Sequence, residues 1–223
     1  MKNLISGIMC CIVLSAGCSD GPLGPSAAGQ IIPLEVGNYW IYSYRKFDSA
    51  GGISYSMEWT EAVDSDTVID GERLYSIRDM VSMFIGFKQY YVNRSDGVYC
   101  YSPGSEPLSL YIKYPVRQNE LIVRRYDTLR VINAMQKTET PAGWFYCVVY
   151  QSVHTLSTGP VYETTYYCPG IGKVKVETGI IGESGEWIPN DDLRLTEYKV
   201  GGTMSQIRLE WNSSAGGGRP REQ

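Results

Sequence analysis

The chain has 223 residues, of which 43% are hydrophobic and 20% are charged, and its formal net charge is −4. This length and composition fit one large globular domain with a sizeable core. The Lys and Arg residues are scattered along the chain, which argues against nucleic acid and anionic membrane surfaces as electrostatic partners. Beyond the N-terminus, no apolar run approaches the ~20 residues of a transmembrane helix.

Residues 1–17 have the features of a secretory signal peptide. A lysine near the start is followed by a run of apolar and small residues over 4–14. Ser15-Ala16-Gly17 then provides the small residues that precede a cleavage site. The run is too short to span a bilayer comfortably. We therefore expect residues 1–17 to direct export and to be removed from the mature protein.

Cys18, directly after Ala16-Gly17, resembles the lipobox cysteine of bacterial lipoproteins. The pattern departs slightly, because Leu14 lies one position further upstream than in the commonest lipobox. The resemblance implies that Cys18 carries a diacylglycerol and anchors the chain to a membrane. Ser19 after the cysteine favours the outer membrane by the sorting rule of enterobacteria. The alternative is an ordinary cleaved signal in which Cys18 is incidental.

Residues 19–30 consist mainly of Gly, Pro, Ser and Ala without periodicity, and they predict a flexible tether. Twelve residues of this composition reach roughly 20 Å as a coil. With Cys18, the segment 18–30 is expected to hold the following domain near the membrane.

From residue 31 the hydrophobic pattern has mostly a period of two, which is typical of β-strands. Over 38–47 it places Trp40, Tyr42 and Tyr44 on one face. Farther along, Asp70-Gly71 and Asp96-Gly97 each separate two such runs, as in hairpins whose type I′ turns require positive φ at both central residues.

Residues 117–137 are ambiguous. Apolar residues there have helical spacing and Asn119 could cap a helix, whereas several β-branched residues and the β context favour strands. Gly37 and Asn119 each follow a proline by four positions and precede an expected strand. Both residue types tolerate positive φ. This echo indicates either two related half-sheets or chance.

The last third again predicts strands joined by turns, with one turn expected at Asn190-Asp191-Asp192 and a disordered tail at 212–223. Residues 31–211 are therefore expected to form a single all-β domain. About ten antiparallel, hairpin-linked strands would form a curved sheet, either a half-open barrel or a sandwich. The strands expected in this third are 144–155, 161–168, 173–177, 193–200 and 207–211.

Three cysteines, Cys100, Cys147 and Cys168, remain after the signal and the lipobox. An exported domain lies in an oxidising compartment, where a disulfide is permitted. If residues 157–160 close a hairpin, Cys147 lies opposite or diagonal to Cys168, near enough to form a disulfide. The alternative is a pair of buried free thiols that pack as small hydrophobic side chains.

Catalytic and metal motifs are weak. His154 is the only histidine, and no Gly-x-Ser-x-Gly motif accompanies it, so a surface role is favoured over a catalytic triad. The cysteines lack the spacing of a zinc site, and the acidic residues at 64–70 lack the ligands of an EF-hand loop. We expect no metal, no cofactor and no enzymatic activity.

Four segments, taken together, resemble those of a widespread group of bacterial lipoproteins, the TapB-like group. The resemblance covers most of 31–200 and implies an all-β fold with no catalytic residues. Trp144 and Cys168 depart from the residues usual at their positions. We expect a lipid-anchored, non-catalytic binding module of the cell envelope that contacts an envelope protein. The alternative is a carrier that holds a lipid or another apolar ligand in a concave sheet. The four segments are 33–42, 66–71, 140–147 and 167–174.

Overall fold

The computed structural model describes residues 30–79, 88–125, 127–157, 159–201 and 203–205. The predictions of a signal peptide at 1–17, of a lipidated cysteine at 18 and of a C-terminal tail at 212–223 lie outside these residues. So do the strand predicted at 207–211 and nearly all of the predicted tether. None of the described residues belongs to a helix that is long and apolar enough to cross a membrane.

The described chain is all-β, as predicted, and its pairings are antiparallel throughout. The strands are β1 (Tyr39–Phe47), β2 (Ile53–Ile69), β3 (Glu72–Arg78), β4 (Tyr90–Arg94), β5 (Gly97–Ser102), β6 (Ser105–Lys113), β7 (Leu121–Val123), β8 (Thr128–Thr140), β9 (Gly143–Leu156), β10 (Gly159–Cys168), β11 (Gly172–Ile181), β12 (Trp187–Val200) and β13 (Thr203–Ser205).

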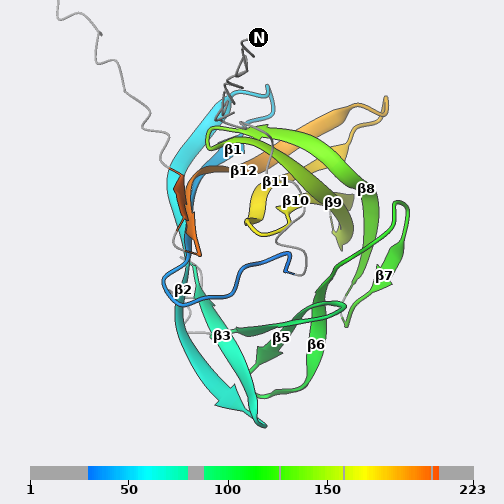
Figure 1. Cartoon of the computed structure of the whole chain (residues 1–223). Helices are drawn as coiled ribbons and strands as arrows, with labels where there is room; N and C mark the ends of the chain where they lie inside the picture. Colours follow the sequence, from blue (N-terminus) through cyan, green and yellow to red (C-terminus); the bar gives the residue numbers. More distant parts are fainter. Residues whose placement is uncertain (1–29, 80–87, 126, 158, 202, 206–223) are drawn as a thin grey trace, which may run out of the picture.

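The strands form two meanders, β1–β6 and β7–β12, which are joined where β1 pairs with β12. In this order β6 and β7 lie at the two ends of the sheet, and β13 pairs only with β12. Figure 1 shows that the sheet curls into a half-open barrel, with the segment before β1 running through the space that it encloses. Of the two arrangements expected from the sequence, a half-open barrel and a sandwich, the half-open barrel is confirmed.

The two meanders begin in the same way, so the echo in the sequence has a structural counterpart. Gly37 has φ +95° and Asn119 has φ +65°. In each half, the amide of this positive-φ residue donates to the carbonyl of a buried valine. The amide of the same valine donates back to the carbonyl of the residue that follows the positive-φ residue in sequence. The residues are Gly37, Asn38 and Val63 in the first half and Asn119, Glu120 and Val131 in the second, with N···O distances of 2.8–2.9 Å. The two half-sheets are therefore related in local structure.

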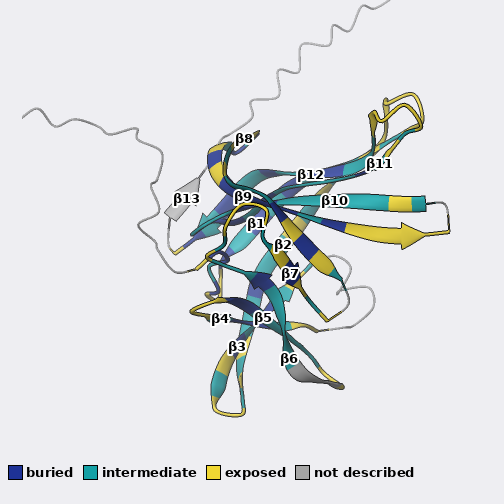
Figure 2. Ribbon diagram, turned by 90° about the vertical axis from the view of Figure 1, so that its right-hand side faces the viewer, coloured by how far each residue is buried: buried dark blue, intermediate teal, exposed yellow. Residues whose placement is uncertain are grey.

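Alternation along β1 places its aromatic residues as predicted. Trp40 and Tyr42 are buried in the core, and Tyr44 packs half-buried beside them. Figure 2 shows that buried residues concentrate in the middle of the sheet, whereas the hairpin tips are exposed. The segment before β1 belongs to the same core, because Ile31 and Leu34 are only 1% and 7% exposed.

Both Asp-Gly pairs lie in hairpins, but only one forms the predicted turn. Asp70 and Gly71 have φ +52° and +81°, as a type I′ turn requires. At the second pair, Asp96 is not among the residues with positive φ, while Gly97 has φ +151°. A Cβ on Gly97 would lie 2.2 Å from the carbonyl oxygen of Ile112. A glycine is therefore required at position 97 because β6 passes close to β5, and not because a type I′ turn forms there.

The range 117–137 contains β7 and most of β8, which resolves that ambiguity in favour of strands. In contrast, the prediction of a turn at residues 190–192 is wrong, because these residues lie within β12, where Asp191 and Asp192 pair with both β1 and β11. Asp192 is tolerated inside the sheet because Arg45 Nε donates to its Oδ1 at 2.8 Å and Arg194 Nε donates to its Oδ2 at 2.9 Å.

This arginine–carboxylate cluster predicts a specific loss of stability in acid. The side chain of Asp192 is only 4% exposed. Burial alone would raise its pKa, but the hydrogen bonds from Arg45 and Arg194 outweigh burial and hold the pKa below its ordinary value. Because the folded pKa is depressed, the stabilisation is present above the unfolded pKa of about 3.9 and is lost as pH falls through the folded value.

Urea unfolding between about pH 7 and pH 2.5 tests this expectation. At neutral pH, Asp192→Asn should lower the free energy of unfolding by about 1.5–3 kcal/mol, the range for a hydrogen bond to a charged group. The difference from the wild type should shrink below about pH 4. The exposed Glu58 gives a control, since Glu58→Gln should change the free energy of unfolding at pH 7 by less than about 0.5 kcal/mol, as for most surface substitutions. A wild-type–variant difference that stays constant down to the lowest pH would contradict the assignment.

Candidate functional site

The interior of the barrel holds a cluster of polar side chains, which we call the lumen cluster: Tyr42, Glu61, Tyr111, Tyr167 and Lys173. Lys173 Nζ lies 2.6 Å from Glu61 Oε1, and the two side chains are 20% and 13% exposed. The Tyr42 hydroxyl donates to the carbonyl of Lys173 at 3.0 Å, and the hydroxyls of Tyr111 and Tyr167 lie 3.3 Å apart. The cluster thus connects β1, β2, β6, β10 and β11 across the interior.

The electrostatics of the lumen cluster favour a structural role. Burial raises the pKa of Tyr42 and of Tyr167 well above the ordinary value. Burial would lower the pKa of Lys173, but the attraction of the Glu61 carboxylate outweighs burial and the pKa is raised. At neutral pH the two tyrosines stay protonated and Lys173 stays charged. None of the three is therefore prepared to act as a base or as a nucleophile.

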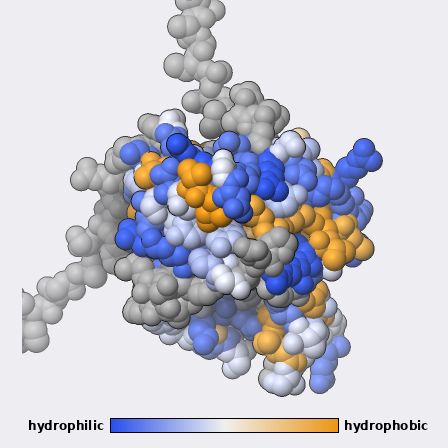
Figure 3. Space-filling view, turned by 90° about the horizontal axis from the view of Figure 1, so that it is seen from below, coloured by the Kyte–Doolittle hydropathy of each residue, from blue (hydrophilic) through white to orange (hydrophobic). Residues whose placement is uncertain are grey.

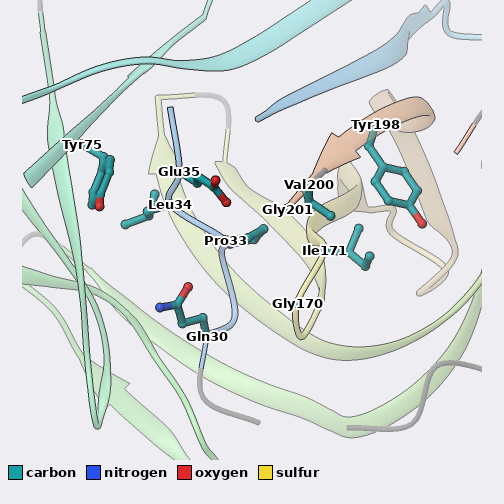
Figure 4. Close-up of a pocket in the computed structure, with 10 residues that line it drawn as sticks. All are labelled: Gln30, Pro33, Leu34, Glu35, Tyr75, Gly170, Ile171, Tyr198, Val200 and Gly201. Atoms are coloured by element: carbon teal, nitrogen blue, oxygen red, sulfur yellow. The ribbon is translucent and has the colours of Figure 1, made fainter. Parts of the chain in front are cut away.

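At one end of the barrel lies a pocket of about 550 Å³, which we call the mouth pocket. Its apolar wall comes from the segment before β1, the turn between β10 and β11, and the end of β12, and Glu35 lies on its rim. Figure 4 shows Pro33, Ile171 and Val200 grouped in its centre. The residues that line it include Pro33, Leu34, Glu35, Ile171, Tyr198 and Val200.

Hydrogen bonds hold the segment before β1 against the barrel and so fix the mouth pocket. The amide of Gly170 donates to the carbonyl of Gln30 at 2.9 Å. Asn93 Nδ2 donates to the carbonyl of Ile32 at 2.9 Å, and Asn38 Nδ2 donates to that of Pro33 at 2.9 Å. Because the carbonyls of this segment bond to the barrel itself, the pocket is formed in the absence of a ligand.

The opposite wall is fixed by Trp40, whose Nε1 donates to the carbonyl of Ile171 at 2.6 Å. Gly172 has φ +103°, and a Cβ there would approach this indole to 3.3 Å. The turn between β10 and β11 therefore packs on β1, the first strand of the barrel. Leu34, Ile171 and Val200 are buried, so the pocket floor is firm and apolar.

The residues that the sequence singled out do not assemble into a catalytic or metal site. His154 is exposed, and its Nε2 lies 3.2 Å from the hydroxyl of Ser152. Cys100, Cys147 and Cys168 are free thiols in this structure. Among the described residues, no group of three or more His, Cys, Asp or Glu side chains could hold a metal ion. A disulfide between Cys147 and Cys168 stays a prediction, as does the lipidation of Cys18.

The lumen cluster and the mouth pocket were missed because their parts are distant in sequence. Glu61 and Lys173 are 112 residues apart, and neither stands in a recognisable motif. One signal was available for the pocket: Ile31 and Ile32 follow a polar tether directly, and two adjacent isoleucines are unusual in an exposed linker.

No protein-family model and no curated protein matches the chain. Two solved structures are similar to it. One is a candidate lipoprotein from Parabacteroides distasonis, with a TM-score of 0.49 and 14% identity over 77% of this chain and 99% of that one. The other is a candidate exported protein with a YmcC-like fold from Bacteroides fragilis, with a TM-score of 0.45, 14% identity and the same coverage. Likeness at this level carries no argument about function, which is therefore inferred from the residues of the site.

Proposed function

We propose that the chain is a lipid-anchored β-domain of the bacterial cell envelope that acts as a non-catalytic binding module. The lipobox-like sequence that ends in Cys18 supports anchoring, and Ser19 supports the outer membrane. The resemblance to the TapB-like lipoproteins agrees with both features. The ligand of the module is an envelope protein, which binds at the mouth pocket.

The observation that carries this proposal is the mouth pocket, with its buried apolar floor and charged rim. Buried Ile171 and Val200 present an apolar surface that an aliphatic or aromatic side chain of a partner can fill. Glu35 is exposed at the edge, where a carboxylate selects for a cationic or donor group on the partner. An apolar anchor in a preformed pocket with a polar rim is the usual arrangement of a protein-binding hot spot.

The surface offers less support for binding elsewhere. Exposed large apolar residues are distributed over several hairpins, including Val68 on β2, Val123 on β7 and Ile181 on β11. Figure 3 shows one face of the molecule, on which apolar side chains form separate groups among polar ones. Scattered apolar residues of this kind are normal on a soluble surface. The mouth pocket is therefore the site that we assign.

The alternative, a carrier of a lipid or another apolar ligand, is favoured only by the apolar lining of the same pocket. A carrier with a half-barrel fold would hold its ligand in the interior. Here Ile31, Ile32 and Leu34 occupy part of that interior, and the lumen cluster occupies another part. An apolar ligand would thus be confined to the mouth pocket, whose volume of about 550 Å³ suits a small molecule rather than a two-chain lipid.

Site-specific photo-crosslinking in living cells tests the protein-binding proposal. A photoreactive amino acid at Glu35 should give one discrete crosslinked species, because this position lies on the rim of the mouth pocket. The same amino acid at Glu58, an exposed position on β2 outside the pocket, is the matched control and should give none. Leu34→Asp, which places a charge in the pocket floor, should abolish the crosslink at Glu35. Equal crosslinking at the two positions, or none at Glu35, would contradict the proposal.

A further inference from the structure

The register between β9 and β10 brings two cysteines to facing positions. Tyr166 pairs with Val149, and Tyr167 pairs with Val148. One further step along the two antiparallel strands places Cys168, the last residue of β10, opposite Cys147 on β9. Directly opposed residues of an antiparallel pair have Cβ atoms about 4.5–5.5 Å apart. This spacing is close to the range of about 3.5–4.5 Å that disulfides adopt.

The surroundings of Cys147 agree with this placement. Lys175 lies over the ring of Tyr166 at 4.9 Å, and Tyr166 precedes Cys168 by two residues on the same face of β10. Burial raises the pKa of the Cys147 thiol to about 12, and a charge on the neighbouring Cys168 adds to the rise. The positive charge of Lys175 lowers the pKa of the same thiol. Cys147 and Cys168 are thus neighbours on one face of the sheet, close enough for a charge on one thiol to change the pKa of the other.

We infer that Cys147 and Cys168 form a cross-strand disulfide in the exported protein and that Cys100 stays a free thiol. Cys100 lies on β5, in the other meander, and pairs with Tyr91 and Ser109 rather than with either cysteine. The register therefore selects one pair out of the three that three cysteines allow. This inference concerns the covalent structure and does not depend on the proposed function.

The oxidation requires a disulfide-bearing thiol oxidase of the envelope, or a small-molecule disulfide, as the electron acceptor. The Cys168 thiol loses its proton and its sulfur attacks one sulfur of the acceptor, whose other sulfur leaves as a thiolate. The Cys147 thiolate then attacks Cys168 Sγ and displaces the acceptor's remaining sulfur. Two thiols are oxidised by two electrons, and one acceptor disulfide is reduced to two thiols.

The folded structure determines when this reaction occurs. Cys147 has no exposed surface, and the pKa values of Cys147 and Cys168 are raised, mainly by burial, to about 12 and about 11. Little thiolate exists in the folded chain at neutral pH, and the attack of Cys147 would be slow. The bond therefore forms during export, before β9 and β10 are covered by the rest of the barrel.

The disulfide would also stiffen the mouth pocket, a consequence that rests on the proposed function. Gly170 and Ile171, which line the pocket, follow Cys168 by only two and three residues. A covalent bond from Cys168 to β9 restricts the turn that carries them. Ligand binding and the disulfide are nevertheless tested separately, because the number of free thiols is measured without any ligand.

The test uses the chain from Ser19 to Gln223, exported to the periplasm by a cleavable signal and purified without reductant. This chain keeps every residue that the structure describes, and its only cysteines are Cys100, Cys147 and Cys168. Denaturation in the presence of an alkylating reagent, followed by intact mass spectrometry, should show one alkylated thiol. After reduction the number should rise to three.

Two further results identify the pair. Cys100→Ser should leave no thiol to alkylate without reductant, and chymotryptic peptides containing Cys147 and Cys168 should be joined. Because alkylation is carried out on denatured protein, a variant that folds poorly still gives an interpretable number. Three alkylated thiols without reductant, or a disulfide that includes Cys100, would overturn the inference.

Discussion

Replacing Lys173 by Met is expected to lower the free energy of unfolding by about 3 kcal/mol, because it leaves the Glu61 carboxylate unpaired inside the barrel. Glu61 is only 13% exposed, and its ion-pair partner is Lys173, whose Nζ lies 2.6 Å from Glu61 Oε1. Methionine retains most of the length of the lysine side chain, so the change removes the charge and little of the packing. Urea unfolding at pH 7 measures the effect.

The double variant Glu61→Gln/Lys173→Met separates the effect of the unpaired charge on stability from the effect of altered packing. Removing both charges should recover a large part of the stability lost in Lys173→Met, since a buried ion pair is worth little relative to a neutral pair. The exposed pair of Arg73 with Asp66, whose side chains are 66% and 39% exposed, is the control. Arg73→Met should cost less than about 1 kcal/mol. Similar losses for Lys173→Met and Arg73→Met would show that the lumen cluster is solvated rather than buried.

The double substitution Ile31→Ala/Ile32→Ala is expected to lower the free energy of unfolding by about 4 kcal/mol or more. Truncation of one buried isoleucine to alanine typically lowers it by about 2–5 kcal/mol. Ile31 and Ile32 are 1% and 5% exposed and belong to the main core. A segment that merely linked an anchor to a domain would tolerate both changes. Urea unfolding is again the measurement.

Val36 provides a matched control within the same segment, because it is 49% exposed. Val36→Ala should change the free energy of unfolding by less than about 0.5 kcal/mol, as for most surface substitutions. If Ile31→Ala/Ile32→Ala unfolds within about 0.5 kcal/mol of the wild type, the segment before β1 is not part of the core.

Features that depend on local chemistry were predictable from the sequence. Strand alternation places Trp40 and Tyr42 in the core, because successive side chains of a strand point to opposite faces. Positive φ at Asp70 and Gly71 follows from the turn that an Asp-Gly pair favours. The same holds for Asn119, since asparagine tolerates the left-handed conformation that the start of the second meander requires.

Features that depend on distant partners were not predictable. Residues 190–192 look like a turn because Asn and Asp favour turns, and the two arginines that keep Asp192 in a strand are not visible in the local pattern. The local pattern predicts a type I′ turn at Gly97, because the neighbour that requires a glycine there, the carbonyl of Ile112, lies 15 residues away on β6. For the same reason, the sequence narrows the position of Cys168 relative to Cys147 only to opposite or diagonal. The pairing of Tyr166 with Val149 and of Tyr167 with Val148 is the observation from which we infer that the two cysteines lie opposite.

The filled interior is the feature that supports the proposed binding module over the carrier. A half-open barrel can hold an apolar ligand between its walls only if its inward side chains leave space. In this chain the segment before β1 packs inside the barrel, and an ion pair crosses the lumen between β2 and β11. The mouth pocket then remains as the assigned site, and its size suits a side chain or a small molecule.

Native mass spectrometry of the chain from Ser19 to Gln223, exported without the lipid anchor and taken directly from the periplasm, distinguishes a binding module with a filled interior from a carrier. We predict a mass equal to that of the polypeptide alone, because the barrel interior is occupied by its own side chains. A small apolar molecule that co-purifies at one copy per chain and is released by denaturation would contradict the binding-module proposal and establish the carrier.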